Sequence, residues 1–300
     1  MTAAAPTPKP MGLSAAESSR GYHRVTTWDA CARRYGFRYG LRLEAQRGAD
    51  APARGSLLHL ALMHHYRALG GFDAEDPIEA MRCAPARIAH QYDSALDVWA
   101  RYVAWAEVED GEWNVLDVER EYAVRLGGRR ITARVDLVVE DSGRVIAVDH
   151  KSAGGKLQYV PREWENSGQM ALLATIGAAV FPGMYGIPFG GVWVNAISTS
   201  GEAPVGLRAR LQIEDAWRLS VLAGLASRLR ELDLIESTPG WGTEAGVFGL
   251  DVSPEACRDR WGRCDYYDVC RAGPKALRSA HLPFDRGTDV VTELREATGL

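Results

Sequence analysis

Two aspartates and a lysine stand close together in the stretch RITARVDLVVEDSGRVIAVDHKS, residues 130–152. Asp136 lies inside the first apolar run, Asp149 ends the second, and Lys151 follows two residues later. Carboxylates bind hard divalent cations, and an ammonium pairs with phosphate. The structural alternative is a solvent-facing strand residue followed by a loop cation. Because unpaired carboxylates are costly to bury among valines and leucines, the pattern favours a metal site.

A β-hairpin is the element that would bring these side chains together. Apolar and polar residues alternate through 130–140, residues 141–143 (DSG) form a turn signal, and 144–149 form the second arm. Successive side chains of a strand point to opposite faces of a sheet. The hairpin therefore places Asp149 and Lys151 on the same face.

The remaining pattern predicts helices and strands around this hairpin. Predicted helices cover residues 56–69, 88–107, 166–181 and 214–234, and predicted strands cover 114–119, 121–126, 190–197 and 204–213. Helices, a mixed meander and a covering helix are typical of an α/β or α+β fold with a central sheet.

Composition bounds the class of protein. The chain has 300 residues, of which 46% are hydrophobic, enough for one large domain. We expect a disordered leader at 1–24, a folded domain at 25–278 and a tail at 279–300. The net charge of −4 means that any basic groove is local. No secretory signal or membrane-spanning run is recognised, so we expect a cytoplasmic protein with reduced cysteines and no membrane partner.

Four short segments, in order along the chain, resemble motifs of the PD-(D/E)xK nuclease superfamily in its RecB-like branch. They are residues 55–59 (GSLLH), similar to a helix motif that ends in histidine, 133–136 (ARVD), similar to the G-x-x-D strand, 148–151 (VDHK), similar to the D-x-K strand, and Gln169, similar to the glutamine of the Q-x-x-x-Y helix motif. The resemblance extends over about residues 26–271, and it implies a protein of a bacterial or phage-infected cell. Ala133 replaces the usual glycine, and Leu173 stands where the family often has tyrosine.

The resemblance implies a restriction-endonuclease-like α/β core, with a central mixed β-sheet flanked by helices, and a metal-dependent DNA nuclease. It implies that Mg²⁺ or Mn²⁺ is held by His59, Asp136, Asp149 and the main-chain carbonyl of His150. Such a cation lowers the pKa of a water ligand and neutralises charge on the scissile phosphate.

The resemblance also implies roles for a lysine and a glutamine. By resemblance, Lys151 would orient the attacking water and pair with the phosphate, and Gln169 would hydrogen-bond a water or a phosphate. With Asp136 and Asp149 these two residues make up the expected catalytic set. His64 and His65 follow His59 on the same predicted helix at spacings that point elsewhere, so we expect them at the surface.

Three of the five cysteines lie within residues 257–270. The spacing lacks a C-x₂-C pair, which argues against common zinc ribbons but leaves a structural zinc site open. It resembles the iron–sulfur clamp of RecB-like and CRISPR-associated nucleases, in which one cysteine precedes the core and three follow it. The resemblance implies a [4Fe–4S] cluster that joins the termini through Cys31, Cys257, Cys264 and Cys270. Cys83 is left as a free thiol.

Arginines and aromatic residues surround these cysteines and could track a DNA backbone with stacking platforms. The residues predicted to contact DNA are Arg33, Arg34, Arg263 and Tyr266, with Trp261 and Tyr267 as further aromatic candidates. The alternative is a Cys-rich knot with solvated charges outside and its aromatic rings inside.

The predicted function is that of an exonuclease that acts on DNA ends or single strands, in recombination, repair or phage- or CRISPR-related DNA processing. Two rivals remain at this point. One is a non-catalytic DNA-binding scaffold with the same fold, and the other is a structural zinc protein.

Overall fold

The computed structural model describes residues 20–45, 50–111, 113–201, 204–259, 262–275 and 284–286. Most of the predicted leader, most of the predicted tail, and Trp261 lie outside the described residues. Helix α1 (Tyr22–Ala30) begins inside the segment predicted as leader, so helical structure starts before residue 25.

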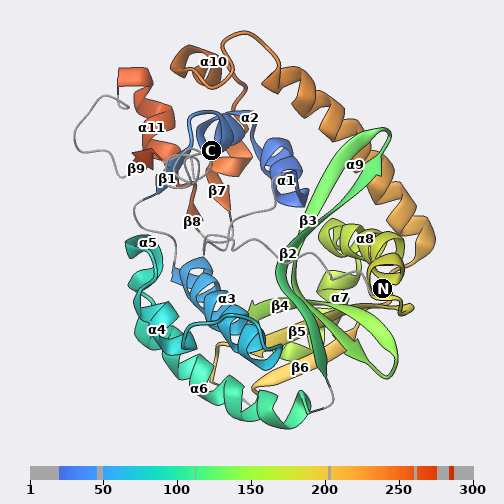
Figure 1. Ribbon diagram of the computed structural model, residues 1–300. Coiled ribbons are helices and arrows are strands. Elements are labelled where there is room, and N and C mark those ends of the chain that lie inside the picture. Colours follow the sequence, from blue (N-terminus) through green and yellow to red (C-terminus); the bar gives the residue numbers. More distant parts are fainter. Residues whose placement is uncertain are drawn as a thin grey trace, which may run out of the picture.

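A five-stranded mixed sheet forms the centre of the molecule (Figure 1). Its order follows the chain: β2 (Asn114–Leu126), β3 (Arg129–Asp141), β4 (Arg144–Ala153), β5 (Phe189–Ser198) and β6 (Gly206–Arg210). Only β4 and β5 run parallel, and the other neighbouring pairs are antiparallel. This mixed sheet agrees with the α/β expectation.

Helices cover both faces of the sheet because β4 is apolar on both sides. Val145 and Ala147 pack in the core shared with α8 (Gly168–Tyr185), while Ile146 and Val148 pack beneath α3 (Asp50–Leu69) and α6 (Tyr92–Glu109). Alternate side chains of one strand thus bury two separate layers. Asp149 and His150 continue this alternation to opposite faces.

Helix α8 is partly buried in the core, and it is also long and apolar enough to span a bilayer, a property that core helices of soluble proteins share. The Ser167 hydroxyl caps its first turn by accepting the Gln169 N–H at 3.2 Å. Gly186 ends it with a φ of 71°, a left-handed conformation that glycine adopts without strain. The cap sets the direction in which Gln169 leaves the helix.

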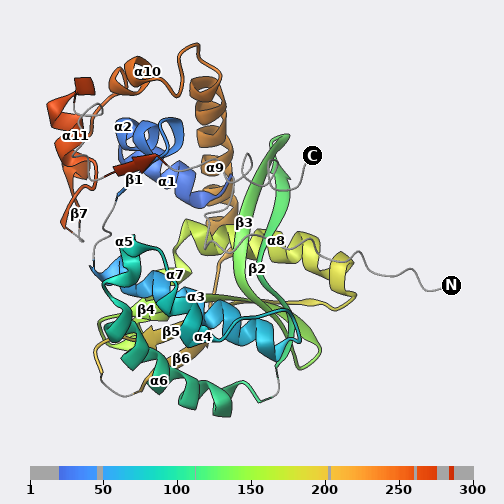
Figure 2. The same cartoon turned by 60° about the vertical axis from the view of Figure 1, so that its left-hand side comes forward.

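Segments from the two ends of the chain pack together beside the sheet. They comprise α1, α2 (Ala32–Tyr35), a π-helical turn (Gly36–Gly40), β1 (Leu43–Ala45), α9 (Asp215–Glu236), α10 (Glu244–Phe248), β7 (Arg258–Asp259), β8 (Gly262–Arg263), α11 (Tyr267–Ala272) and β9 (Phe284–Arg286). The β2–β3 hairpin extends from the sheet towards α1 and α9, as both views show (Figure 2).

Several predicted boundaries differ from the structure. Strand β2 is continuous where two strands were predicted on either side of Arg120. The predicted helix at 88–107 is interrupted at His90 and Gln91, between α5 (Ala86–Ala89) and α6. Helix α4 (Pro77–Arg82), α7 (Val160–Glu165) and the 3₁₀ turns at Leu157–Tyr159 and Pro254–Cys257 were not predicted, because such short elements carry little periodic signal.

Candidate active site

The sheet opens where the predicted aspartates lie. The β3–β4 ladder extends from Asp141↔Arg144 to Leu137↔Val148 and ends there, one residue before Asp136 and Asp149. Beyond that point Asp136 replaces the ladder, because its Oδ2 accepts the His150 main-chain N–H at 2.8 Å. Strand β4 stays paired to β5 through Ala153. On the β3 side, the main-chain N–H of His150 therefore bonds a carboxylate and not the main chain of a neighbouring strand.

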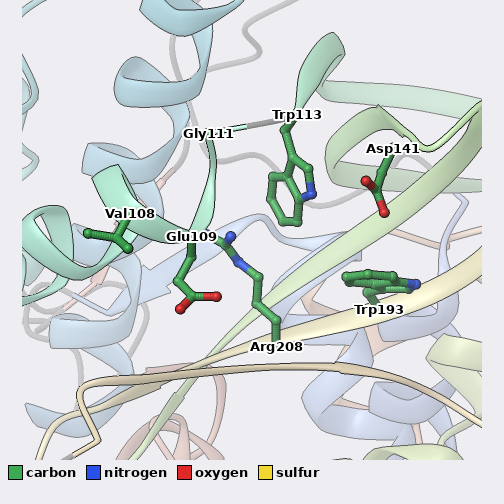
Figure 3. A pocket seen from close by; sticks show the side chains of 7 residues that line it. All are labelled: Val108, Glu109, Gly111, Trp113, Asp141, Trp193 and Arg208. Carbon is green, nitrogen blue, oxygen red and sulfur yellow. The ribbon is translucent and has the colours of Figure 1, made fainter.

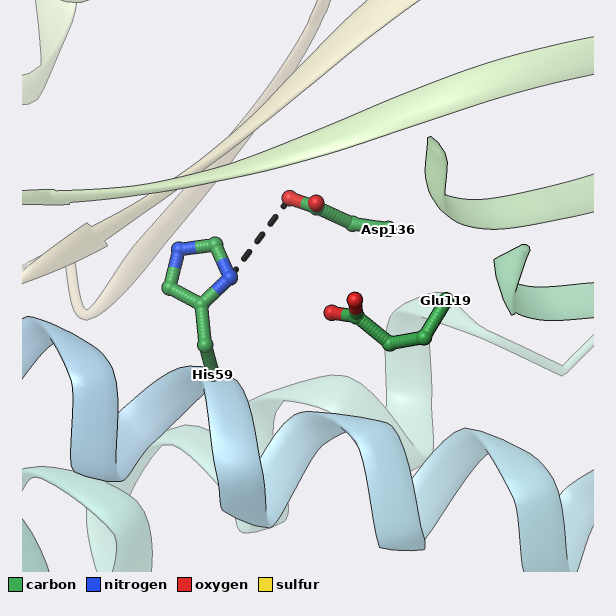
Figure 4. A group of neighbouring side chains, drawn as sticks. All are labelled: His59, Glu119 and Asp136. Carbon is green, nitrogen blue, oxygen red and sulfur yellow. Dashed lines mark ion pairs between the residues drawn. The ribbon is translucent and has the colours of Figure 1, made fainter. Parts of the chain in front are cut away.

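Helix α3 supplies His59 to this opening. Its Nδ1 lies 3.6 Å from Asp136 Oδ2 (Figure 4), and the ring also hydrogen-bonds the His150 main chain. Burial lowers the pKa of His59, with the Asp136 carboxylate opposing that shift. A neutral imidazole is the form that binds a metal. The structure thus brings together three of the predicted ligand groups.

Glu119 is a further candidate ligand, and sequence reasoning missed it. Potential ligand atoms of His59, Glu119 and Asp136 all lie within 4.8 Å of one another (Figure 4). Glu119 is 8% exposed, and burial together with the Asp136 and Asp149 carboxylates raises its pKa well above the usual value. Its φ of 53° is uncommon for a residue with a side chain.

The hairpin crosses between layers at these two residues. On β2, Val118 packs beneath α3, whereas Tyr122, four residues later, packs in the α8 core. On β3, Val135 and Leu137 likewise belong to opposite layers, although they are two residues apart. A regular strand would keep each pair on one face. The change of face occurs around Glu119 and Asp136 and brings both carboxylates to the opening.

Asp149 lies on the α8 side with Lys151 and Gln169, as predicted for the strand. Gln169 Nε2 donates to Asp149 Oδ1 at 2.8 Å, and Lys151 forms an ion pair with Oδ2. Burial raises the pKa of Asp149 to about 7, with Lys151 lowering it and Asp136 raising it further. The Lys151 ammonium also lies 4.3 Å from the ring centroid of Trp164.

The surroundings of Gln169 and of His64 differ from those expected from the sequence. Gln169 hydrogen-bonds a carboxylate of the site, so in this structure its amide orients Asp149. Leu173, which replaces the family's tyrosine, is 2% exposed and belongs to the core. His64 is buried rather than at the surface, and its Nδ1 accepts the Glu75 N–H at 2.9 Å. His65 is partly buried beside Trp99.

The donor set fits a hard divalent cation. Ligand atoms of His59, Glu119 and Asp136 lie within 4.8 Å of one another, and the Asp149 carboxylate is near enough to raise the pKa of Glu119. Oxygen-rich sets of this kind suit Mg²⁺ or Mn²⁺. Buried carboxylates with raised pKa values repel one another, and a cation among them would remove that penalty. The residues present therefore fit the metal that the sequence implied.

The predicted cysteine ligands come from both ends of the chain and lie in one region. Cys31 is close enough to Cys264 to affect its pKa, which burial raises. The Cys264 N–H donates to the Cys257 carbonyl at 3.0 Å. Cys270 Sγ lies 3.6 Å from Nη1 of Arg33. Cys83 is exposed and lies outside this group.

Two of the residues predicted to contact DNA instead form hydrogen bonds within the protein. Arg33 donates to the carbonyls of Phe248 and Leu250, which anchors α2 to α10. Tyr266 is 6% exposed and donates to the Leu43 carbonyl at 2.8 Å, so its ring offers no stacking surface. Arg34 is half-buried near Cys264.

Arg263 is exposed. It pairs with Asp268 at 3.0 Å and lies over the Tyr267 ring. Of the four residues predicted to contact DNA, Arg263 is the one whose side chain is exposed.

A cavity of about 470 Å³ lies apart from the carboxylates. It is lined by Val108, Glu109, Gly111, Trp113, Asp141, Trp193 and Arg208 (Figure 3). None of the residues described above as metal ligands lines it.

A mixed sheet flanked by helices, with carboxylates and a lysine where two strands part, defines an α/β fold of the restriction-endonuclease type. A sequence model of the PD-(D/E)XK nuclease superfamily matches residues 22–271, and the chain belongs to this superfamily. The protein is thus placed among nucleases, which act on nucleic acid.

Solved structures show distant similarity. The chain is similar to a candidate exonuclease from Eubacterium rectale, with 11% identity and a TM-score of 0.47, covering 86% of this chain and 92% of that one. It is also similar to SSO0001, with 12% identity and a TM-score of 0.32, covering 73% and 85%. No curated protein matches the chain.

Proposed function

We propose that the protein is a Mg²⁺- or Mn²⁺-dependent deoxyribonuclease, and that it acts as an exonuclease on DNA ends or single strands in DNA recombination, repair or phage- or CRISPR-related processing. The observation that carries the proposal is the convergence of Asp136, Asp149 and Lys151 where β3 and β4 part. Membership of a nuclease superfamily supports it. The proposed location is the reducing cytoplasm.

The residues of the site divide into holding and positioning roles. His59, Glu119, Asp136, Asp149 and the His150 carbonyl would hold the cation. When bound, it would supply a water of lowered pKa and neutralise charge on the phosphate.

Lys151 and Gln169 act on the substrate side of the site. The Lys151 side chain lies beside Asp149 and over the face of Trp164. There it would pair with a phosphate oxygen and orient the attacking water. Gln169 keeps Oδ1 of Asp149 in place.

We also propose a [4Fe–4S] cluster on Cys31, Cys257, Cys264 and Cys270. The four cysteines come from both ends of the chain, and Cys31 is close enough to Cys264 to affect its pKa. Four thiolates suit a [4Fe–4S] cluster, and a structural zinc ion is the alternative.

DNA cleavage by anaerobically prepared protein tests the proposed activity. End-labelled single- and double-stranded DNA is incubated with Mg²⁺ or Mn²⁺, and DNA binding is measured in parallel. We expect label release by the wild type. Asp136→Asn should lose the activity but still bind DNA. Binding without cleavage under either metal would instead identify a non-catalytic scaffold, and internal cleavage products would show an endonuclease.

A further inference from the structure

The imidazole of His150 lies on the opposite face of β4 from Asp149 and Lys151. Its Nδ1 is 2.8 Å from Nδ2 of Asn195, the residue directly across from it on β5. The Asn195 amide also donates to the Tyr102 hydroxyl at 2.7 Å, and that hydroxyl pairs with the Tyr66 hydroxyl at 2.8 Å. We name His150, Asn195, Tyr102 and Tyr66 the His150 brace.

The brace is buried, and its contacts fix the orientation of the His150 imidazole. Its four members are 0–3% exposed. The Tyr66 ring stacks on the His150 imidazole, with centroids 5.4 Å apart and planes 10° apart. Buried hydrogen bonds of this kind are directional, and breaking one leaves an unsatisfied polar group. The imidazole is therefore held both by an amide in the sheet and by a ring on α3.

The brace is anchored at its far end by Arg208. Its Nη2 lies 3.3 Å from the Tyr66 hydroxyl, and the guanidinium pairs with Asp110. The guanidinium carbon lies 4.0 Å from the ring centroid of Trp113 and 4.8 Å from that of Trp105. Figure 3 shows Arg208 beside Trp113 in the cavity wall. A guanidinium packed against two indoles gives the chain of hydrogen bonds a fixed end.

The main chain of the braced residue serves the metal site. The His150 N–H holds Asp136, and the His150 main chain is also bonded by His59. Tyr66 follows His59 by seven residues on α3, which places the two on the same helix face. The brace thus joins α3, α6, β4 and β5 at the residue whose peptide groups set the distance between His59 and Asp136.

We propose that Asn195, Tyr102 and Tyr66 are positioning residues that act through the His150 side chain to fix the cation site. The inference rests on the proposed metal-dependent function. Groups behind metal ligands typically contribute about 10–100-fold in metal affinity. An apolar residue at position 195 should therefore weaken Mn²⁺ binding although Asn195 touches no proposed ligand atom.

Mn²⁺ affinity, measured by calorimetry on the full chain, tests the proposal independently of cleavage. We expect Asn195→Leu to weaken binding by about 10-fold or more and Tyr102→Phe by a smaller factor. The decisive experiment is a double-mutant cycle with His150→Leu. In protein that already carries His150→Leu, Asn195→Leu should reduce Mn²⁺ affinity little further. Ser198→Ala is the matched control, because Ser198 is equally buried on β5 but bonds Ser200.

Other outcomes contradict the inference, the proposed function or both. If folded Asn195→Leu binds Mn²⁺ as the wild type does, the brace does not position the site. If the effects of Asn195→Leu and His150→Leu multiply, the two residues act separately. Should Asn195→Leu fail to fold, Tyr102→Phe, which removes one hydroxyl, provides the same cycle. A wild type that binds no Mn²⁺ contradicts both this inference and the proposed function, whereas normal binding without cleavage contradicts the function alone.

Discussion

At the scale of single residues, Asp149 shows how the site is kept ready for a cation. It is 2% exposed, and its pKa is raised to about 7 mainly by burial. Its pKa in an unfolded chain is about 3.9. At a pH between these two pKa values, Asp149 is ionised in the unfolded chain but stays protonated in the folded one. The stability of the metal-free protein should therefore fall as the pH rises from about 4 to 7.

Asp149→Asn should remove this penalty. In chelator at pH 7.5 we expect the variant to have a higher Tm than the wild type, by about 2 °C or more for each kcal/mol gained. The difference should vanish near pH 4, where Asp149 is protonated in both states. Thermal unfolding followed by circular dichroism measures this. With Mn²⁺ present, the wild type should gain stability that the variant does not. A lower Tm for the variant at pH 7.5 in chelator would contradict the argument.

The proximity of most candidate site residues could be predicted, because short motifs select them. His59, Asp136, Asp149, Lys151 and Gln169 stand at spacings that indicate their roles, and the structure brings them together. The partners of Gln169 and of Tyr266 could not be predicted. Each depends on which elements pack against it, and that is a property of the tertiary fold.

At the scale of elements, the β2–β3 hairpin does more than present Asp136. Its change of face places Glu119 against Asp136, at a backbone conformation that a strand pattern does not predict. This is why the sequence indicated two strands here instead of one. The point at which the β3–β4 ladder ends could not be predicted from the sequence either, because register and ladder length depend on both strands at once.

Glu119→Gln tests this part of the hairpin. The substitution keeps the shape of the side chain but removes a charge from the proposed ligand set, so we expect weaker Mn²⁺ affinity and slower cleavage. Glu121→Gln is the control on the same strand, since Glu121 pairs with Arg130 at 3.3 Å away from the site. Calorimetry and the end-label assay report both quantities. Equal behaviour of the two variants would exclude Glu119 from the metal site.

At the scale of the whole molecule, the two ends of the chain meet beside the sheet. Sequence reasoning predicted this meeting from the cysteines, and the structure shows Cys31 near Cys264 and Arg33 bonded to Phe248 and Leu250. The small apolar cluster between them contains Phe37 and Tyr266. With so small a core, the proposed cluster would contribute much of the stability of this region.

Cys31→Ser should therefore lose iron and lower the Tm. Because the carboxylates lie in the sheet, we expect Mn²⁺ affinity to change little in protein that remains folded. Cys83→Ser is the matched control, since Cys83 is exposed and lies outside the group. Iron and sulfide analysis of anaerobic preparations, with about four of each expected per wild-type chain, measures the effect. Stoichiometric zinc in a colourless wild type would contradict the cluster.

The open side of the hairpin bears on how the protein behaves in concentrated solution. From Arg129 to Asp136, β3 is laddered only to β2 within the described sheet. Its other edge is met by Arg20, which accepts the Thr132 N–H at 3.2 Å and donates to the Thr132 hydroxyl at 2.9 Å. An uncovered strand edge can recruit another chain, and charged residues along it oppose this. The main chain of Arg20 thus covers this edge at Thr132, and loss of that contact would leave the edge open to pairing with another chain.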